Sequence, residues 1–266
     1  MEPLVLIHGF SGIPAMWEPM LPDLQERFDV HPLGLAGHFG CAPFPEGTEI
    51  SAKSLFDALE RDMDEAGIET AHICGNSLGG WAALDLANRG RARSCVPISP
   101  AGGWEPGSRQ ERRLTPLFKR EYATSVWANK RRERIFLRPR LRKLAFRDIV
   151  EHAERMTPRQ AADILQGSAE CPIYWDLFDA LSKGGPPHDF DGIDCPTTIV
   201  WGTKDRILPL KGYSERIRRL VPQAEFIELD GAGHSPMIDE PERLVQIISE
   251  TASRAREAVA AGDPAA

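Results

Sequence analysis

A single serine stands between glycines in the stretch HICGNSLGGWAAL, which covers residues 72–84. Ser77 lies where a short apolar run gives way to a helix-forming run, so the chain must turn sharply there. Gly75 and Gly79 remove side chains that would collide with the residue at such a turn. This pattern is typical of a serine held out for reaction. The sequence therefore predicts that Ser77 is a nucleophile.

A serine hydroxyl reacts poorly at neutral pH unless a base lies within hydrogen-bond reach and another group orients that base. After the apolar run TTIVW the chain reads GTKD, which ends in Asp205, and after FIELD it reads GAGH, which ends in His234. If both runs are strands of a parallel sheet, the loops after them meet at one edge. We expect His234 to be the base and Asp205 to orient it. Asp191 and Asp194 are the alternative acids.

A glycine-bearing loop, HGFSG, follows the first apolar run and supplies a candidate oxyanion hole. We expect the backbone N–H of Phe10, in this loop, and the N–H of Leu78, after the nucleophile, to point at the developing negative charge. His8 is expected to shape its loop by hydrogen bonding.

The elements that must position these residues alternate between short Val- and Ile-rich runs and helix-like segments, which is typical of a parallel sheet covered on both faces. One amphipathic helix is predicted within residues 54–67, with Leu55, Leu59 and Met63 inward and Gly67 at its end. Another is predicted from Pro241 to about residue 261, followed by a frayed tail. The predicted strands cover residues 4–7, 29–33, 71–74, 94–98, 197–201 and 225–229.

Residues 103–190 interrupt this alternation, because they are rich in Arg, Pro and aromatic residues and contain no convincing strand. We interpret them as a helical cap inserted into a core domain of residues 1–102 and 191–266. Between Glu105 and Asp148 there are fourteen Lys or Arg and five Asp or Glu. A solvated helical face is the favoured interpretation of this charge, and an Arg that binds an anionic substrate is the alternative. Trp81, Trp127 and Trp175 are candidate pocket residues.

Composition excludes several classes of function. The chain has 266 residues, 42% apolar content and a net charge of −7, which argues against nucleic-acid binding. Its five scattered cysteines suggest neither a disulfide framework nor a metal site, and buried Cys74 and Cys95 are expected in strands. No apolar run is long enough for a signal peptide or a membrane span. We expect a cytoplasmic monomer or homodimer that needs no metal or cofactor and has no nucleic-acid or membrane partner.

Four blocks, HGFSG, GNSLGG, WGTKDRILP and GAGHSPMIDEP, resemble in order and spacing those of α/β-hydrolase fold enzymes with a helical cap. The resemblance extends from about residue 4 to about residue 250 apart from the cap. It implies a mostly parallel, doubly wound sheet and the roles given above for Ser77, Asp205 and His234. Two departures stand out: the loop GLAGHF at residues 34–39 lacks the usual acid and proline, and the usual first strands are missing.

This resemblance favours a serine hydrolase that cleaves a small carboxylic ester, lactone or thioester through an acyl-enzyme. Three alternatives stay open at this point. One is hydrolysis of a carbon–carbon bond in a vinylogous diketone acid, and another is elimination or rearrangement of an anionic substrate without hydrolysis. The third is a small-ligand receptor on the same fold.

Overall fold

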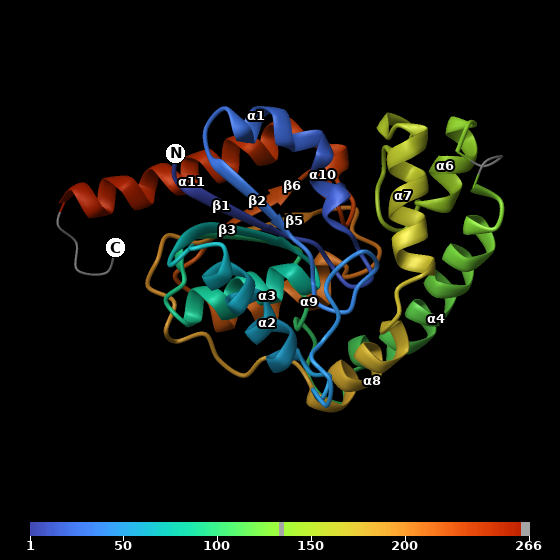
Figure 1. Cartoon of the computed structure of the whole chain (residues 1–266), viewed down its shortest axis with the longest axis horizontal. Helices are drawn as coiled ribbons and strands as arrows, with labels where there is room; N and C mark the ends of the chain where they lie inside the picture. Colours follow the sequence, from blue (N-terminus) through green and yellow to red (C-terminus); the bar gives the residue numbers. More distant parts are fainter. Residues whose placement is uncertain (133–135, 262–266) are drawn as a thin grey trace.

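Six parallel strands form one sheet in the computed structural model, which describes residues 1–132 and 136–261 (Figure 1). The apolar runs of the sequence predict all six strands, and the observed strand ends differ from the predicted ends by at most two residues. The order across the sheet is β2-β1-β3-β4-β5-β6, and every described pair is parallel. The strands are β1 (Pro3–Ile7), β2 (Asp29–Leu33), β3 (Ala71–Asn76), β4 (Ala92–Ile98), β5 (Thr198–Gly202) and β6 (Glu225–Leu229).

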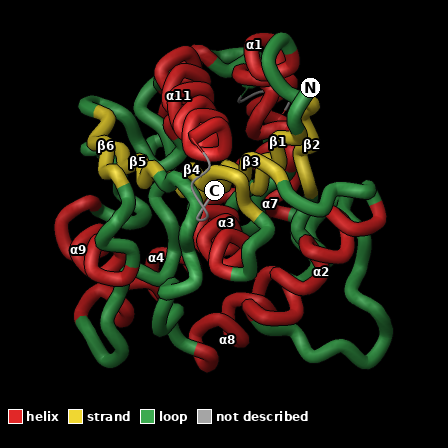
Figure 2. The backbone as a smooth tube through the Cα atoms, turned by 90° about the vertical axis from the view of Figure 1, so that its left-hand side faces the viewer, coloured by secondary structure: helices red, strands yellow, loops and turns green. Residues whose placement is uncertain are grey.

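Both faces of the sheet are covered, as the unbroken apolar strands predict. Successive side chains of a strand point to opposite faces. Accordingly, Leu4 and Leu6 join one buried cluster whereas Val5 and Ile7 join the other. Helices α1 (Leu21–Gln25) and α11 (Pro241–Ala261) lie on one face, preceded in the chain by the turns η1 (Pro14–Met20) and α10 (Pro236–Asp239). Helices α2 (Ala52–Glu65), α3 (Leu78–Asn88) and α9 (Leu210–Leu220) cover the other face (Figure 2).

The two amphipathic helices predicted from spacing are confirmed. Leu55, Leu59 and Met63 of α2 are buried, and Gly67 after it has a φ of 72°. Helix α2 begins two residues before the predicted start because Ser51 caps it and bonds reciprocally with Ser54. Helix α11 has the predicted bounds, and the predicted frayed tail falls largely on residues 262–266, outside the described part of the chain.

The segment between β4 and β5 is helical, and no strand occurs among its described residues. These helices lie together at one end of the sheet (Figure 1), and α4 packs along α7. The boundaries of a separate cap at residues 103 and 190 stay a prediction; below, "cap" denotes this helical segment. Its elements are α4 (Arg109–Asn129), α6 (Pro139–Ala145), η2 (Ala153–Arg155), α7 (Pro158–Ala169) and α8 (Tyr174–Gly184).

The strand order fixes where a ligand can bind. From β1 the chain moves to β2 on one side and then returns to β3 on the other side, so the order reverses between β1 and β3. In open α/β sheets, ligands bind at the carboxyl ends of the strands beside such a reversal. The HGFSG loop leaves β1 at this point and the turn containing Ser77 leaves β3, which makes their junction the candidate site.

Candidate active site

Ser77 occupies the sharp turn that its flanking glycines predict. It lies between the last residue of β3 and the first of α3 with φ 57° and ψ −116°, an unfavourable conformation for a residue with a side chain. A Cβ at Gly75 would lie 2.0 Å from the carbonyl oxygen of Gly79, and a Cβ at Gly79 would lie 2.3 Å from that of Ile7. Glycine is therefore required at both positions for the turn to form.

His234 and Asp205 meet at the same edge of the sheet, as the strand ends predict. The Nδ1 atom of His234 lies 2.7 Å from Oδ2 of Asp205, and both residues are buried. The other oxygen of Asp205 accepts hydrogen bonds from the backbone N–H groups of Ile207 and Leu208, at 2.9 and 2.8 Å. These bonds fix the carboxylate, which in turn fixes the orientation of the imidazole ring. The alternative acids Asp191 and Asp194 are exposed.

Ser77 and His234 line one small cavity together. In the part of the chain that the structure describes, Ser77 Oγ and His234 Nε2 are not hydrogen-bonded to each other. Such bonds are commonly long in enzymes without substrate and tighten in the reacting complex. Asn76 holds the two loops together, because its side-chain amide donates to the carbonyl oxygen of His234 at 2.9 Å.

The two predicted oxyanion donors lie beside Ser77. Phe10 and Leu78 line the cavities next to it, and neither backbone N–H has a hydrogen-bond acceptor among the described residues. Leu78 is also the first residue of α3, whose N-terminal N–H groups and dipole favour negative charge. Both N–H groups are therefore available to an oxyanion.

His8 shapes its loop, as expected, and does no chemistry in this arrangement. Its Nε2 accepts the N–H of Leu35 at 3.0 Å, and its Nδ1 lies 2.8 Å from the carbonyl oxygen of Gly9. Burial, with a smaller contribution from His38, lowers the pKa of His8 to about 3. The ring is therefore neutral and holds the loop that carries Phe10.

The GLAGHF loop, which departs from the family pattern, contributes to the same support. His38 from this loop is buried and its ring contacts that of His8 edge to face, with centroids 5.2 Å apart. Burial also lowers the pKa of His38 to about 4. A buried neutral histidine pair thus joins this loop to the HGFSG loop, where the sequence alone indicated no partner for His38.

Asp239 is a residue that sequence reasoning missed. It is fully buried, and its carboxylate accepts hydrogen bonds from the backbone N–H groups of Gly233 at 2.8 Å, His152 at 2.8 Å and Glu151 at 3.0 Å. It thereby ties the loop that carries His234 to an inner segment of the cap. In the sequence, Asp239 is one of two adjacent acidic residues in HSPMIDEP, and no pattern around it indicates that it is buried.

Two cavities flank Ser77. The larger, of about 340 Å³, is mainly apolar, and its walls include Leu78, Trp81, Trp104 and Leu181. The smaller, of about 90 Å³, contains His234 and several hydroxyl groups. Both cavities share Ser77, and the side chains of Phe10, Phe118 and Ile207 also line both.

Of the three tryptophans predicted as pocket residues, Trp81 lines the larger cavity beside Ser77 and the other two do not. Trp127 and Trp175 line neither cavity beside Ser77, and their exposed fractions are 55% and 39%. Trp127 lies on the outward face of α4, where the guanidinium of Arg131 packs over its ring. Trp175 packs on the aromatic rings of Tyr122 and Phe178. Aromatic composition could not distinguish the cap's outer surface from the cavity wall.

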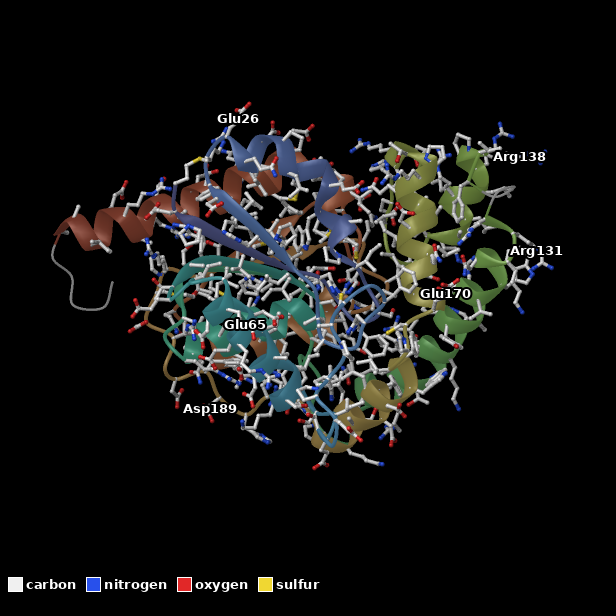
Figure 3. All side chains as sticks on the ribbon, in the orientation of Figure 1. Glu26, Glu65, Arg131, Arg138, Glu170 and Asp189 are labelled. Atoms are coloured by element: carbon white, nitrogen blue, oxygen red, sulfur yellow. The ribbon has the colours of Figure 1, made fainter. Side chains whose placement is uncertain are left out.

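The basic residues of the cap are mostly solvated. Arg131 and Arg138 project away from the sheet (Figure 3), and both are exposed. Buried Arg142 donates to backbone carbonyls of Phe136 and Glu154. Arg112 lines the larger cavity beside Glu111, so that wall presents both signs of charge. The favoured interpretation of the charge run as a solvated face therefore agrees with the described side chains.

The cysteines, metal sites and membrane spans considered in the sequence can also be compared with the structure. All five cysteines are free, and Cys74 and Cys95 are buried in β3 and β4. No group of three or more His, Cys, Asp or Glu side chains is arranged to hold a metal ion in residues 1–132 and 136–261. Over the same residues, no helix is both long enough and apolar enough to cross a membrane.

Comparison with known proteins identifies the family. Residues 4–247 match a model described as "Alpha/beta hydrolase family". An epoxide hydrolase of Mycobacterium tuberculosis, EphH, is 34% identical over 202 residues, which cover 75% of this chain and 94% of that protein. A pimeloyl-[acyl-carrier protein] methyl ester esterase of Neisseria meningitidis is 29% identical over 261 residues, which cover 91% of this chain and 90% of the relative.

Solved structures agree on the fold. An enol-lactonase from Burkholderia xenovorans LB400 superposes with a TM-score of 0.71 at 19% identity, covering 95% of this chain and 91% of the lactonase. At that identity the likeness shows the fold alone. Because the family model spans most of the chain and a curated relative exceeds 30% identity over three quarters of it, this protein belongs to the α/β-hydrolase family and is a hydrolase.

Proposed function

We propose that this hydrolase cleaves carboxylic esters in which an apolar acid of moderate length is joined to a small alcohol. The observation that carries the proposal is the position of Ser77 between two unequal cavities, of which only the smaller contains His234. The base that takes the proton from the serine must later return it to the leaving alcohol. The alcohol therefore belongs on the side of His234, and the acyl chain belongs in the larger cavity.

The volumes set the sizes of the two parts. The larger cavity has nearly four times the volume of the smaller one, so it has room for the longer part of the ester. Cavities of about 340 Å³ and 90 Å³ thus suit a medium-length acyl chain and a very small alcohol. The relative that is named a methyl ester esterase also releases the smallest alcohol, which agrees with this assignment.

In the proposed acylation step, Oγ of Ser77 attacks the ester carbonyl carbon while Nε2 of His234 removes the hydroxyl proton. Asp205, which accepts from Nδ1 at 2.7 Å, stabilises the resulting imidazolium and keeps the ring oriented. The N–H groups of Phe10 and Leu78 donate to the carbonyl oxygen as it becomes negative. Removing one such donor typically costs about 3–4 kcal/mol of transition-state stabilisation.

The intermediate then collapses to an acyl-enzyme. The carbon–oxygen bond to the alcohol breaks, and His234 returns its proton to the departing alkoxide in the smaller cavity. Water enters the space that the alcohol leaves, gives a proton to His234 and attacks the acyl carbon. The acid leaves Ser77, which regains its proton from His234, and the enzyme returns to its initial state.

Epoxide opening, the activity named for the 34% identical relative, suits this nucleophile less well. A serine oxygen that attacked an epoxide carbon would form an ether, and water does not hydrolyse an ether under mild conditions. Attack on an ester carbonyl instead gives an acyl-serine that water cleaves. Ser77 at the turn therefore favours acyl transfer over epoxide opening.

Two isomeric esters test the proposed orientation. Methyl nonanoate and octyl acetate have the same atoms, but the long chain lies on the acid side in one and on the alcohol side in the other. We expect methyl nonanoate to be hydrolysed at least about tenfold faster in kcat/KM, measured by titration of the released acid. Faster cleavage of octyl acetate would reverse the assignment of the cavities.

Labelling with a fluorophosphonate tests the nucleophile. We expect intact-mass analysis to show one adduct, and peptide mapping to place it on Ser77. The Ser77→Ala variant should gain no adduct and should lose at least about a thousandfold in ester hydrolysis. A folded wild-type protein that neither reacts with the probe nor cleaves either ester would refute the proposed function.

A further inference from the structure

Three serine hydroxyls besides Ser77 form part of the wall of the smaller cavity. Ser11 from the HGFSG loop, Ser125 from α4 and Ser168 from α7 all line it. Their hydroxyl oxygens form a chain, with 3.2 Å between Ser11 and Ser168 and 3.3 Å between Ser168 and Ser125. Three segments far apart in the sequence thus bring hydroxyls together in the cavity that His234 also lines.

This chain has unused hydrogen-bonding capacity. A serine hydroxyl donates one hydrogen bond and can accept two. Ser168 donates to Ser125, so Ser11 donates to Ser168, and the proton of Ser125 has no acceptor among the described residues. Both contacts are also longer than the 2.7–2.8 Å that is usual between two hydroxyl oxygens. A hydroxyl placed in the cavity could therefore accept from Ser125 and donate to a neighbouring oxygen.

The backbone at Ser11 indicates that its position is not incidental. Ser11 has φ 54°, a left-handed conformation that costs energy for any residue with a side chain. The turn is closed by a 3.0 Å hydrogen bond from the N–H of Gly12 to the carbonyl oxygen of Gly9. Unfavourable backbone of this kind collects at ligand sites, and here it places a hydroxyl on the cavity wall.

Glu121 adds an acceptor to the same wall. It lies on α4, lines the cavity and is half-buried, with one carboxyl oxygen 3.1 Å from a guanidinium nitrogen of Arg120. Tyr174, also in the wall, already donates its hydroxyl to the carbonyl oxygen of Phe118. A carboxyl group there can accept from a neutral ligand hydroxyl, whereas it would repel an alcohol that carries a carboxylate or phosphate group.

We propose that the smaller cavity selects an alcohol that carries a second hydroxyl two carbons from the ester oxygen, as in the monoester of a 1,2-diol. A 2-hydroxyethyl group has two carbons and one oxygen beyond the ester oxygen, so it is a short group for the smaller of the two cavities, of about 90 Å³. This inference rests on the proposed function, because it assigns the leaving group of the same reaction.

A pair of esters of equal size tests it. The 2-hydroxyethyl and propyl esters of nonanoic acid differ in one terminal group, OH in place of CH₃. We expect wild-type kcat/KM to favour the 2-hydroxyethyl ester by about tenfold, since one additional hydrogen bond in a site with unsatisfied hydroxyls changes binding by about that factor. Released ethylene glycol and propanol are quantified directly, so both reactions are read on the same scale.

Serine-to-alanine variants test whether the serine hydroxyls cause the preference for the 2-hydroxyethyl ester. In Ser168→Ala and Ser125→Ala the preference should fall to about twofold or less, while fluorophosphonate labelling of Ser77 continues. Ser182→Ala, which removes a hydroxyl from the larger cavity, should leave the ratio of the two esters at its wild-type value. Thermal unfolding of each variant shows whether it is folded.

The possible failures are distinguishable. If the wild type cleaves both esters at equal rates, or prefers the propyl ester, the inference is wrong and the proposed esterase function stands. A preference that persists in both serine variants also overturns it. If neither ester is cleaved and Ser77 is not labelled, the proposed function itself has failed.

Discussion

The two cavities beside Ser77 differ in size and in access to the base. The larger one is mainly apolar, with Glu111 and Arg112 in its wall, and helices α3, α4 and α8 contribute to it. The smaller one is a quarter of its volume, carries hydroxyl and carboxyl groups and contains His234. Ester hydrolysis by a serine nucleophile treats the two parts of the ester differently, because the acyl part stays bound to the serine while the alcohol leaves with a proton. The asymmetry of the cavities follows the asymmetry of that reaction.

The two-cavity arrangement predicts that residues needed for catalysis and residues that set substrate preference can be told apart. Substitution of a catalytic residue, or of a residue that positions one, should change the hydrolysis rate of every ester by the same factor. Residues on one wall should change the preference for only the acid or only the alcohol. Each variant can therefore be assigned by measuring a small set of esters rather than one.

Among the variants compared below, Asp205→Asn is expected to have the largest effect. It leaves the shape of both cavities intact but removes the carboxylate that orients His234 Nδ1. We expect kcat to fall by roughly 10²–10⁴ for every ester, with unchanged preference between methyl nonanoate and octyl acetate. Steady-state kinetics on the two isomers measures both quantities.

Asp191→Asn is the matched control, because this exposed aspartate is one of the two alternative acids in the sequence. It should retain wild-type kinetics within about twofold. A severe loss in Asp191→Asn together with an active Asp205→Asn would show that the acid has been misassigned.

The sequence predicted the sheet and the meeting of Ser77, Asp205 and His234 because these depend on short-range signals. Apolar runs mark strands, and the end of a parallel strand fixes the edge to which its loop belongs. Gly75 and Gly79 could be interpreted for the same reason, since the steric demand of the turn acts within two residues of Ser77.

What the sequence could not predict depends on long-range packing. Ser125 and Ser168 meet only because α4 packs along α7, and neither residue stands in a recognisable motif. Asp239 is buried only because a cap segment lies over it. Trp127 was placed wrongly because helical spacing in the cap does not reveal which face turns to solvent.

Mild acid should destabilise the HGFSG loop, whose Phe10 lines both cavities. The folded pKa of His8 is lowered to about 3, against about 6.5 in the unfolded chain. Below pH 6.5, His8 binds a proton in the unfolded chain but stays neutral in the folded protein. The free energy of unfolding therefore decreases progressively from pH 6.5 towards pH 3. We expect His8 to contribute about 1.4 kcal/mol of lost unfolding free energy per pH unit in that window.

Urea unfolding between pH 7 and pH 4.5 measures this slope. His8→Asn should be less stable than the wild type at pH 7, because it loses the bond to the N–H of Leu35, yet its stability should fall less steeply with acid. Buried His38, whose pKa is lowered to about 4, adds a slope of the same sign and similar size over a shorter pH window, and this slope remains in the variant. Identical slopes in the two proteins would mean that His8 is not held neutral in the fold.

Leu181→Trp should have the smallest effect and should act on one cavity alone. Leu181 lies on α8 in the wall of the larger cavity, so a bulkier side chain shortens the space for the acyl chain. We expect kcat/KM for methyl nonanoate to fall about tenfold, while methyl butyrate changes less than about threefold. The ratio between 2-hydroxyethyl and propyl esters should stay constant, because the smaller cavity is untouched. Leu144→Trp, at an exposed position on α6, controls for added bulk in the cap. Equal losses for long and short acyl chains, or a changed alcohol preference, would mean that the two cavities do not act separately.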